Sequence, residues 1–159
     1  MKLLITSLYF LMSFFVISEA ESQLYEEAIE IMIDDSSKED QIHCFCKKNF
    51  TIMKEVVDFE SISFLFKDEI KEHSKGTIKD QVIEVSDSRI ELGRKKSKFK
   101  IYLTNVRNGI FFAQQFCDGK KSNTTYDDIS LFGQSQAYMF KVMPSGQVTL
   151  VKVKRLSHN

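Results

Sequence analysis

Residues 24 to 57 carry apolar side chains at helical spacing. In the first part of this stretch they recur every three or four residues, with glutamates between them: Leu24, Ala28, Ile31 and Met32. Ser36 and Glu39 then have the spacing of a capping box, which predicts that a second helix begins there. At about 100° per residue, the apolar face of this second helix contains Ile42, Phe45, Cys46, Met53, Val56 and Val57.

The segment from Asp58 to Lys75 has a less regular pattern. Its apolar residues are Ile62, Phe64, Leu65, Phe66 and Ile70. They fit either a third short helix or a buried strand, because short apolar runs do not separate the two by periodicity alone. We favour the helix.

The second half of the chain alternates apolar and polar residues with the period of two that is typical of strands. Within 98–106, Phe99, Ile101 and Leu103 share one face. Asn108-Gly109 predicts a tight hairpin turn directly after that strand. Strands are therefore predicted over 81–92 (with a bulge or turn near 86–88), 98–106, 110–117, 136–143 and 147–156, with a polar loop over 120–128 and a second hairpin through Pro144-Ser145-Gly146.

This order of elements predicts an α+β fold, in which N-terminal helices pack against one face of an antiparallel sheet. The net charge is zero, but residues 21–90 hold 17 Asp and Glu against 9 Lys and Arg, whereas residues 91–159 hold 4 against 12. The simpler explanation is an acidic helical half packed near a basic sheet half. The alternative is a basic sheet edge that meets an anionic partner.

The first twenty residues have the layout of a secretory signal peptide. Lys2 supplies a short positive start, residues 3–17 form an almost unbroken apolar run, and Ser18 and Ala20 suit a cleavage site. An apolar run of about 15 residues is shorter than the roughly 20 that a membrane span needs. We therefore expect cleavage after residue 20, no membrane attachment afterwards, and a secreted single domain over 21–159.

Three cysteines are present, and secretion favours oxidation over metal binding. The cluster His43-Cys44-Phe45-Cys46 matches no common zinc spacing, so no metal site is predicted. We predict a disulfide between Cys46 and Cys117, because Cys46 lies on the apolar helix face that should meet the sheet. Cys44 is the alternative partner of Cys117. Such a bridge would add several kcal/mol to the free energy of unfolding, because it restricts the unfolded chain.

Two Asn-x-Thr sequons are candidate glycosylation sites. Asn123 lies in the predicted polar loop and should be accessible. Asn49 falls near the middle of the predicted apolar helix face, where a glycan would not fit, so Asn123 is the better candidate.

The densest basic run is a candidate anion patch. It could bind sulfated glycans or an anionic lipid surface, or be cut by a dibasic protease; the simpler interpretation is a solvated hairpin loop. Its basic residues are Arg94, Lys95, Lys96, Lys98 and Lys100.

No catalytic, cofactor-binding or nucleic-acid-binding motif is recognisable. The three histidines, His43, His73 and His158, are scattered, and the acidic residues have the spacing of solvated helix faces. Overall neutrality together with export argues against a nucleic-acid partner. The aromatic strand over 110–116 fits an ordinary sheet core or, with its glutamines as polar handles, the wall of a pocket.

Taken as a whole, residues 21–159 resemble the NTF2-like superfamily, and in particular its small secreted nematode members, most of which have no assigned function. The resemblance rests on the order of elements: a helix with Leu24, Ala28 and Met32, a helix with Cys46 and Met53, the segment Phe64-Leu65-Phe66, and then strands ending at Val151 and Val153. It implies a conical fold with helices in the concave side of a bent sheet, an internal cavity, and dimerisation through the sheet face.

Three hypotheses of function follow. The leading one is a secreted, non-enzymatic domain that binds a small apolar ligand or another protein. The second is an NTF2-like enzyme with an unrecognised acid–base residue in the cavity. The third is a binder of anionic glycans through the basic residues over 94–100, joined by Lys152, Lys154 and Arg155. The hypothesis of a cystatin-type protease inhibitor has little support. The inhibitory loop of that family needs a glycine, which is missing from Gln81-Val82-Ile83-Glu84-Val85, and the chain has no Trp.

Overall fold

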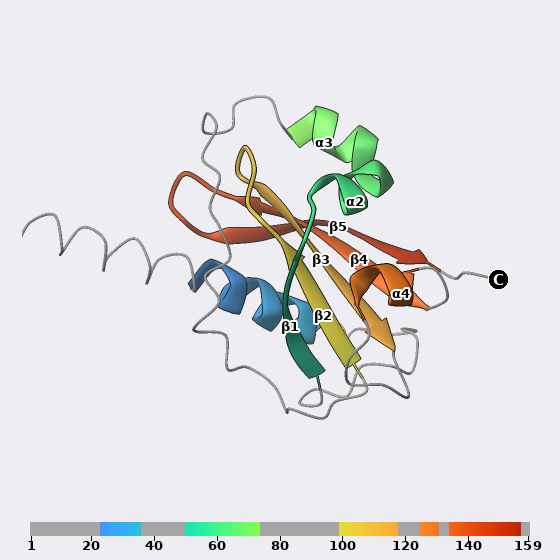
Figure 1. Ribbon diagram of the computed structural model, residues 1–159. Coiled ribbons are helices and arrows are strands. Elements are labelled where there is room, and N and C mark those ends of the chain that lie inside the picture. The colour runs from blue at the N-terminus through green and yellow to red at the C-terminus, as the bar shows by residue number, and fades with distance from the viewer. Residues whose placement is uncertain (1–22, 36–49, 74–98, 118–124, 131–133, 157–159) are drawn as a thin grey trace, which may run out of the picture.

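The computed structural model describes residues 23–35, 50–73, 99–117, 125–130 and 134–156 (Figure 1). A helix covers 23–35. The elements after it are β1 (Phe50–Val57), α2 (Glu60–Ser63), the 3-10 helix η1 (Phe64–Phe66), α3 (Lys67–His73), β2 (Phe99–Thr104), β3 (Ile110–Cys117), α4 (Tyr126–Ser130), β4 (Ser135–Val142) and β5 (Val148–Leu156). The α+β class and most predicted strands of the second half are thereby confirmed. The predicted strand over 81–92 lies outside the described residues.

The sheet has five strands in the order β1-β2-β3-β4-β5, and it is mixed rather than antiparallel. β2 to β5 pair antiparallel, whereas β1 pairs parallel with β2. The prediction of a helix through 50–57 was wrong. This segment contains the β-branched residues Thr51, Ile52, Val56 and Val57, which suit a strand, and pairing with β2 decides the outcome.

Helices cover both faces of the sheet, which corrects the prediction that they pack on one. We call the side packed against helix 23–35 the first face; its buried residues include Ile101, Leu103 and Phe111. The second face packs against α2, η1 and α4, and it includes Tyr102 and Phe112. Because side chains alternate along a strand, β2, β3 and β4 each supply apolar residues to both faces. Such strands must be apolar on both sides.

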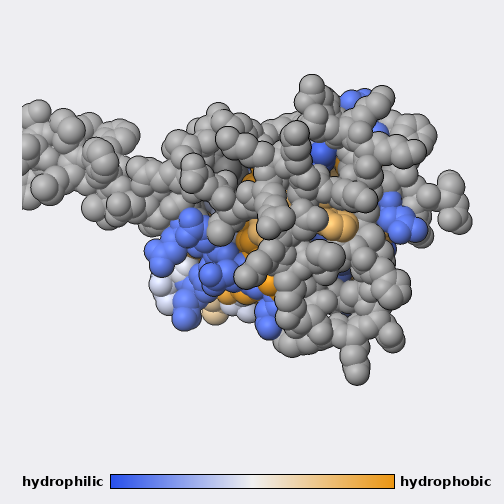
Figure 2. Space-filling view, turned by 90° about the horizontal axis from the view of Figure 1, so that it is seen from below, coloured by the Kyte–Doolittle hydropathy of each residue, from blue (hydrophilic) through white to orange (hydrophobic). Residues whose placement is uncertain are grey.

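Apolar burial and polar contacts from Tyr25 and Glu27 hold helix 23–35 against the sheet. Leu24, Ala28 and Met32 are buried, as their spacing predicts. The hydroxyl of Tyr25 donates to the carbonyl oxygen of Thr104 at 3.2 Å. At the edge strand β5, a carboxylate oxygen of Glu27 accepts from the backbone N–H of Val148 at 3.2 Å. Figure 2 shows hydrophilic side chains beside apolar ones at the position of this helix, as expected for a helix that turns its apolar side to the sheet.

The predicted Asn-Gly hairpin is confirmed between β2 and β3. Asn108 and Gly109 both have positive φ angles, 52° and 68°, as a type I′ turn requires. Arg107 and Ile110 exchange both backbone hydrogen bonds across the turn. The turn is also tied to the sheet, because the N–H of Val142 donates to the carbonyl oxygen of Gly109 at 2.7 Å.

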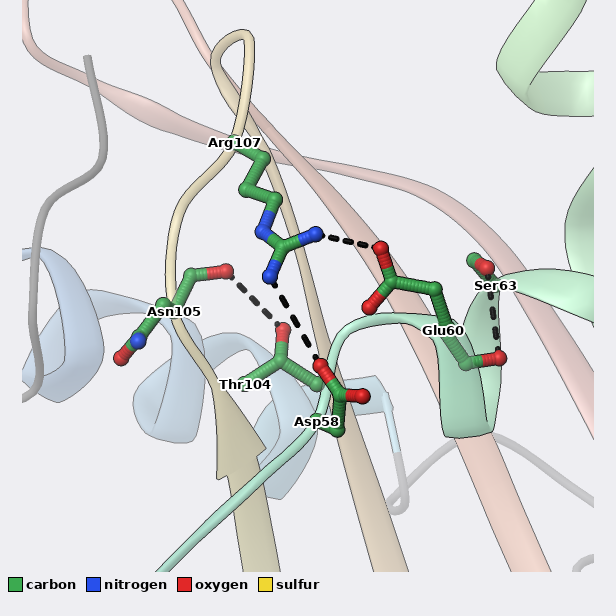
Figure 3. Close-up of polar contacts among 6 residues, drawn as sticks. All are labelled: Asp58, Glu60, Ser63, Thr104, Asn105 and Arg107. Atoms are coloured by element: carbon green, nitrogen blue, oxygen red, sulfur yellow. Dashed lines mark hydrogen bonds and ion pairs between the residues drawn. The ribbon is translucent and has the colours of Figure 1, made fainter.

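The side chain of Arg107 joins this hairpin to the segment that leaves β1 (Figure 3). Its guanidinium bonds to Glu60 and lies 3.6 Å from a carboxylate oxygen of Asp58, and it stacks over the ring of Phe59 at 5.3 Å. The pKa of Asp58 is raised, mainly by a hydrogen bond with the Glu60 carboxyl group, and the charge of Arg107 offsets only part of this rise. The same hydrogen bond and the charge of Arg107 lower the pKa of Glu60. All three charged side chains are exposed, so this is a surface contact of modest strength.

Lys154 fixes the helical segment to β5 on the second face. Its ammonium donates to the carbonyl oxygen of Leu65 at 2.6 Å and lies 2.9 Å from Glu69. The same ammonium sits 5.1 Å from the centre of the Phe66 ring. Hydrogen bonding from Lys154 is the main cause that lowers the pKa of Glu69. This contact is better sheltered than the one at Arg107, since the Glu69 side chain is only 19% exposed.

The β4–β5 turn offers a direct test of backbone strain. Gly146 has φ of +88°, and a Cβ added there would meet no atom within 4 Å. Gly146→Ala should therefore lower the free energy of unfolding by about 1 kcal/mol through conformation alone. Gly146→Asn should lower it less, because Asn tolerates positive φ. Urea denaturation measures both. Equal losses for Ala and Asn would contradict a purely conformational cause.

The Lys154–Glu69 contact should make stability depend on acid pH. The pKa of Glu69 is lowered in the folded protein. Its contribution to the free energy of unfolding is therefore complete at pH values above its ordinary pKa of 4.5, and it is lost as the pH falls through the lower pKa of the folded state. Glu69→Gln should therefore destabilise the protein near neutral pH, and the difference from wild type should shrink below about pH 4. Denaturation at several pH values measures this. Glu72→Gln, an exposed position on the same helix, is the control and should show no such convergence.

Candidate functional site

The candidate site begins with two neighbouring glutamines in the central strand β3. Gln114 is 3% exposed and Gln115 is 4% exposed. β3 pairs with β4 in continuous register, so adjacent residues must point to opposite faces. Gln115 shares the first face with Phe111 and Ala113, whereas Gln114 shares the second with Phe112. Each apolar face therefore receives one buried amide.

On the second face, the buried amide of Gln114 is fully engaged. The hydroxyl of Tyr126, from α4, donates to Gln114 Oε1 at 2.7 Å. Gln114 Nε2 in turn donates to the hydroxyl of Ser135 at 2.9 Å. Burial, with a smaller contribution from Asp127, raises the pKa of Tyr126 to about 12, so its hydroxyl keeps its proton. This network fixes the short helix α4 to the sheet and leaves its polar atoms paired.

On the first face, two buried polar atoms have no hydrogen-bond partner among the described residues. Within the part of the chain that the structure describes, neither Gln115 Oε1 nor the hydroxyl oxygen of Tyr138 has a hydrogen-bond partner. Tyr138 is 0% exposed. In the β3–β4 register Ala113 lies opposite Tyr138, and Gln136 lies opposite Gln115. Tyr138 and Gln115 are thus diagonal neighbours on adjacent strands. The backbone positions of such a pair are typically about 7–8 Å apart, a gap that long side chains can reach across.

Apolar core side chains surround this pair, and two charged side chains influence Tyr138. The ring of Tyr138 stacks on Phe140 with centroids 6.2 Å apart, and Val153 is its partner on β5. Burial raises the pKa of Tyr138, the nearby carboxylate of Asp35 raises it further, and Arg155 lowers it. The hydroxyl is therefore neutral over the physiological range. It can donate and accept hydrogen bonds but carries no charge.

Chemically, the pair offers one acceptor and one hydroxyl. Gln115 Oε1 can only accept, whereas the Tyr138 hydroxyl can donate one hydrogen bond and accept others. Buried polar atoms are nearly always paired in folded proteins, and an unpaired one calls for water, an ion or a ligand. The arrangement is therefore suited to a small group that donates to the amide and contacts the phenol.

The structure places few of the residues that the sequence singled out. Lys100 belongs to β2 and is 3% exposed, which does not fit a solvent-facing role in an anion patch. Cys117 is the last residue of β3, opposite Phe99. The other predicted site residues lie outside the described residues, as does the signal peptide over 1–20; they are Cys44, Cys46, Asn49, Arg94, Lys95, Lys96, Lys98 and Asn123.

The aromatic strand was interpreted as core or as pocket wall, and its phenylalanines are core. Phe111, Phe112 and Phe116 are all 0% exposed. The glutamines of the same strand were named as polar handles, but their tyrosine partners were missed. Tyr138 lies within the predicted strand over 136–143, so a buried phenol could have been expected there. Tyr126 gave no such signal, because it lies in the segment interpreted as a polar loop, where the structure instead forms α4.

Comparison of the chain with protein-family models, with curated proteins and with solved structures found no match. Within the described ranges, no three His, Cys, Asp or Glu side chains are grouped as a metal ion would require. No helix within those ranges has the length and apolar character needed to cross a membrane.

The contrast between the two faces yields a stability prediction. Tyr126→Phe removes the donor to Gln114 and leaves a buried oxygen unpaired, so it should lower the free energy of unfolding by about 1–2 kcal/mol. Tyr138→Phe removes a hydroxyl that has no partner among the described residues, so it should leave stability unchanged or raise it. Urea denaturation of ligand-free protein compares the two. A loss at Tyr138 equal to that at Tyr126 would show that its hydroxyl is engaged.

Proposed function

We propose that this protein is a secreted, non-enzymatic binding domain that holds a small, mostly apolar ligand between helix 23–35 and the first face of the sheet. The observation that carries the proposal is the pair formed by Gln115 Oε1 and the Tyr138 hydroxyl, both buried and without hydrogen-bond partners among the described residues. Apolar core residues of the same face, such as Phe111 and Phe140, would contact the rest of the ligand.

The free energy of the unpaired atoms supports this proposal. A buried donor or acceptor without a partner costs about 1–3 kcal/mol. Two such atoms on one face would be a considerable burden for a domain whose total stability is about 5–15 kcal/mol. A ligand that pairs with both atoms removes this cost, and its stabilising effect adds to that of its own apolar burial.

The chemistry of the pair favours binding over catalysis. A glutamine amide does not titrate, and burial and Asp35 keep Tyr138 protonated. An acid–base enzyme needs a group whose pKa lies near the working pH. The Gln115–Tyr138 pair can orient a ligand, but it is poorly suited to move a proton.

The sequence resemblance agrees with this location. An NTF2-like cone would enclose its cavity beneath the N-terminal helices, which is where helix 23–35 meets the first face. Secretion is part of the same proposal and rests on the signal-peptide pattern of residues 1–20. Oxidation of Cys117 with Cys46 or Cys44, and glycosylation at Asn123, would then accompany export.

The binding proposal is tested by titration with a neutral apolar fluorophore, N-phenyl-1-naphthylamine, using the secreted full-length product. We expect saturable binding at one site per chain and a higher melting temperature at saturating probe. Ala113→Met should weaken probe binding at least tenfold, because the longer side chain extends over the first face beside Tyr138. Native mass spectrometry of the same preparation would reveal a co-purifying molecule.

The matched control is Ala137→Met, because Ala137 is equally buried in the neighbouring strand but belongs to the second face. It should leave probe affinity within about twofold in protein that remains folded. Absence of saturable binding by folded wild-type protein, or equal loss in the two variants, would rule out a ligand site on the first face.

A further inference from the structure

We infer that the ligand of the first face is an uncharged apolar molecule that carries a hydroxyl group, and that this hydroxyl bridges Gln115 and Tyr138. The inference rests on the proposed function, since it names the chemical class that the same site would take. It follows from the identity of the two unpaired atoms, from their spacing and from the charges around them.

A hydroxyl is the smallest group that satisfies both atoms together. Gln115 Oε1 accepts only, so the ligand must supply a donor to it. The Tyr138 hydroxyl has a proton to give, so a ligand oxygen that also accepts from it uses the donors and acceptors of both side chains. An alcohol oxygen does both. An ether or ester oxygen accepts from Tyr138 but leaves Gln115 unpaired.

The second face shows the same chemistry already completed within the chain. There the hydroxyl of Tyr126 donates to Gln114 Oε1 at 2.7 Å, and the hydroxyl of Ser135 accepts from the same amide at 2.9 Å. A buried glutamine of β3 thus uses hydroxyl groups as its partners. On the first face the corresponding glutamine, Gln115, has no such partner for its oxygen within the described residues.

Burial and the surrounding charges select against an ionised group. Tyr138 is 0% exposed and Gln115 is 4% exposed, so a charge placed between them would lose its hydration. Neither side chain carries a compensating charge. The carboxylate of Asp35 raises the pKa of Tyr138, so its field would also repel an anion there. Arg155, which acts in the opposite direction, is exposed and screened by water.

The test uses ligands of one chain length that differ only at the head: 1-decanol, decane, decyl methyl ether and decanoate. Each displaces N-phenyl-1-naphthylamine from the full-length secreted protein near pH 7. Two neutral hydrogen bonds should give 1-decanol about a tenfold advantage over decane. Decyl methyl ether should lie close to decane, because it leaves Gln115 unpaired. Decanoate should bind more weakly than the alcohol.

Two substitutions assign the advantage to the two side chains. Tyr138→Phe and Gln115→Met preserve size, and each should reduce the preference for 1-decanol over decane to about threefold or less. The double variant should bind both ligands equally. Tyr126→Phe is the matched control: it should lower stability but keep the full preference for 1-decanol, since it acts on the second face.

The outcomes separate this inference from the proposed function. If the probe binds and decane displaces it as well as 1-decanol does, the hydroxyl inference is overturned while binding stands. That result would mean that the two polar atoms are paired with buried water. A preference for 1-decanol that survives in the double variant would overturn the inference as well. If neither probe nor any decyl ligand binds folded protein, the proposed function fails first.

Discussion

The structure depends on one constraint: β3 is the middle strand of the sheet and is covered on both faces. Its partners β2 and β4 supply the hydrogen bonds on either side, while helices bury its side chains above and below. A strand in this position must be apolar on both sides, and the run of phenylalanines in β3 meets that requirement. Any polar atom placed there needs a partner, because water does not reach it.

The two glutamines of β3 show how differently that need is met. On the second face, α4 brings a tyrosine to Gln114, so the buried amide becomes part of the attachment of a short helix that buries only Tyr126 and Ile129. On the first face, Tyr138 lies diagonally across from Gln115, yet the two polar atoms remain unpaired within the described residues. The same pair of residue types is thus hydrogen-bonded on one face and, among the described residues, is without hydrogen-bond partners for these two atoms on the other.

Polar contacts outside the core hold the covering elements in place and thereby define the two faces. Tyr25 and Glu27 attach helix 23–35 to the interior strand β2 and the edge strand β5. Lys154 attaches the segment around Leu65 to β5 on the second face. The contacts of Tyr25 and Glu27 hold helix 23–35 at β2 and at β5, on either side of the central strand β3.

The sequence by itself determined the local structure of several elements that carry a periodic or turn signal. The helix with Leu24 and Met32, the Asn108-Gly109 turn and the alternation of β2 each follow from short-range rules of backbone and burial. Only the tertiary structure decided that 50–57 is a strand, because its pairing with β2 joins segments more than forty residues apart and overrides a helical pattern. The placement of Gln115 and Tyr138, whose polar atoms have no partner among the described residues, was likewise decided by the tertiary structure, because only the β3–β4 register makes them neighbours.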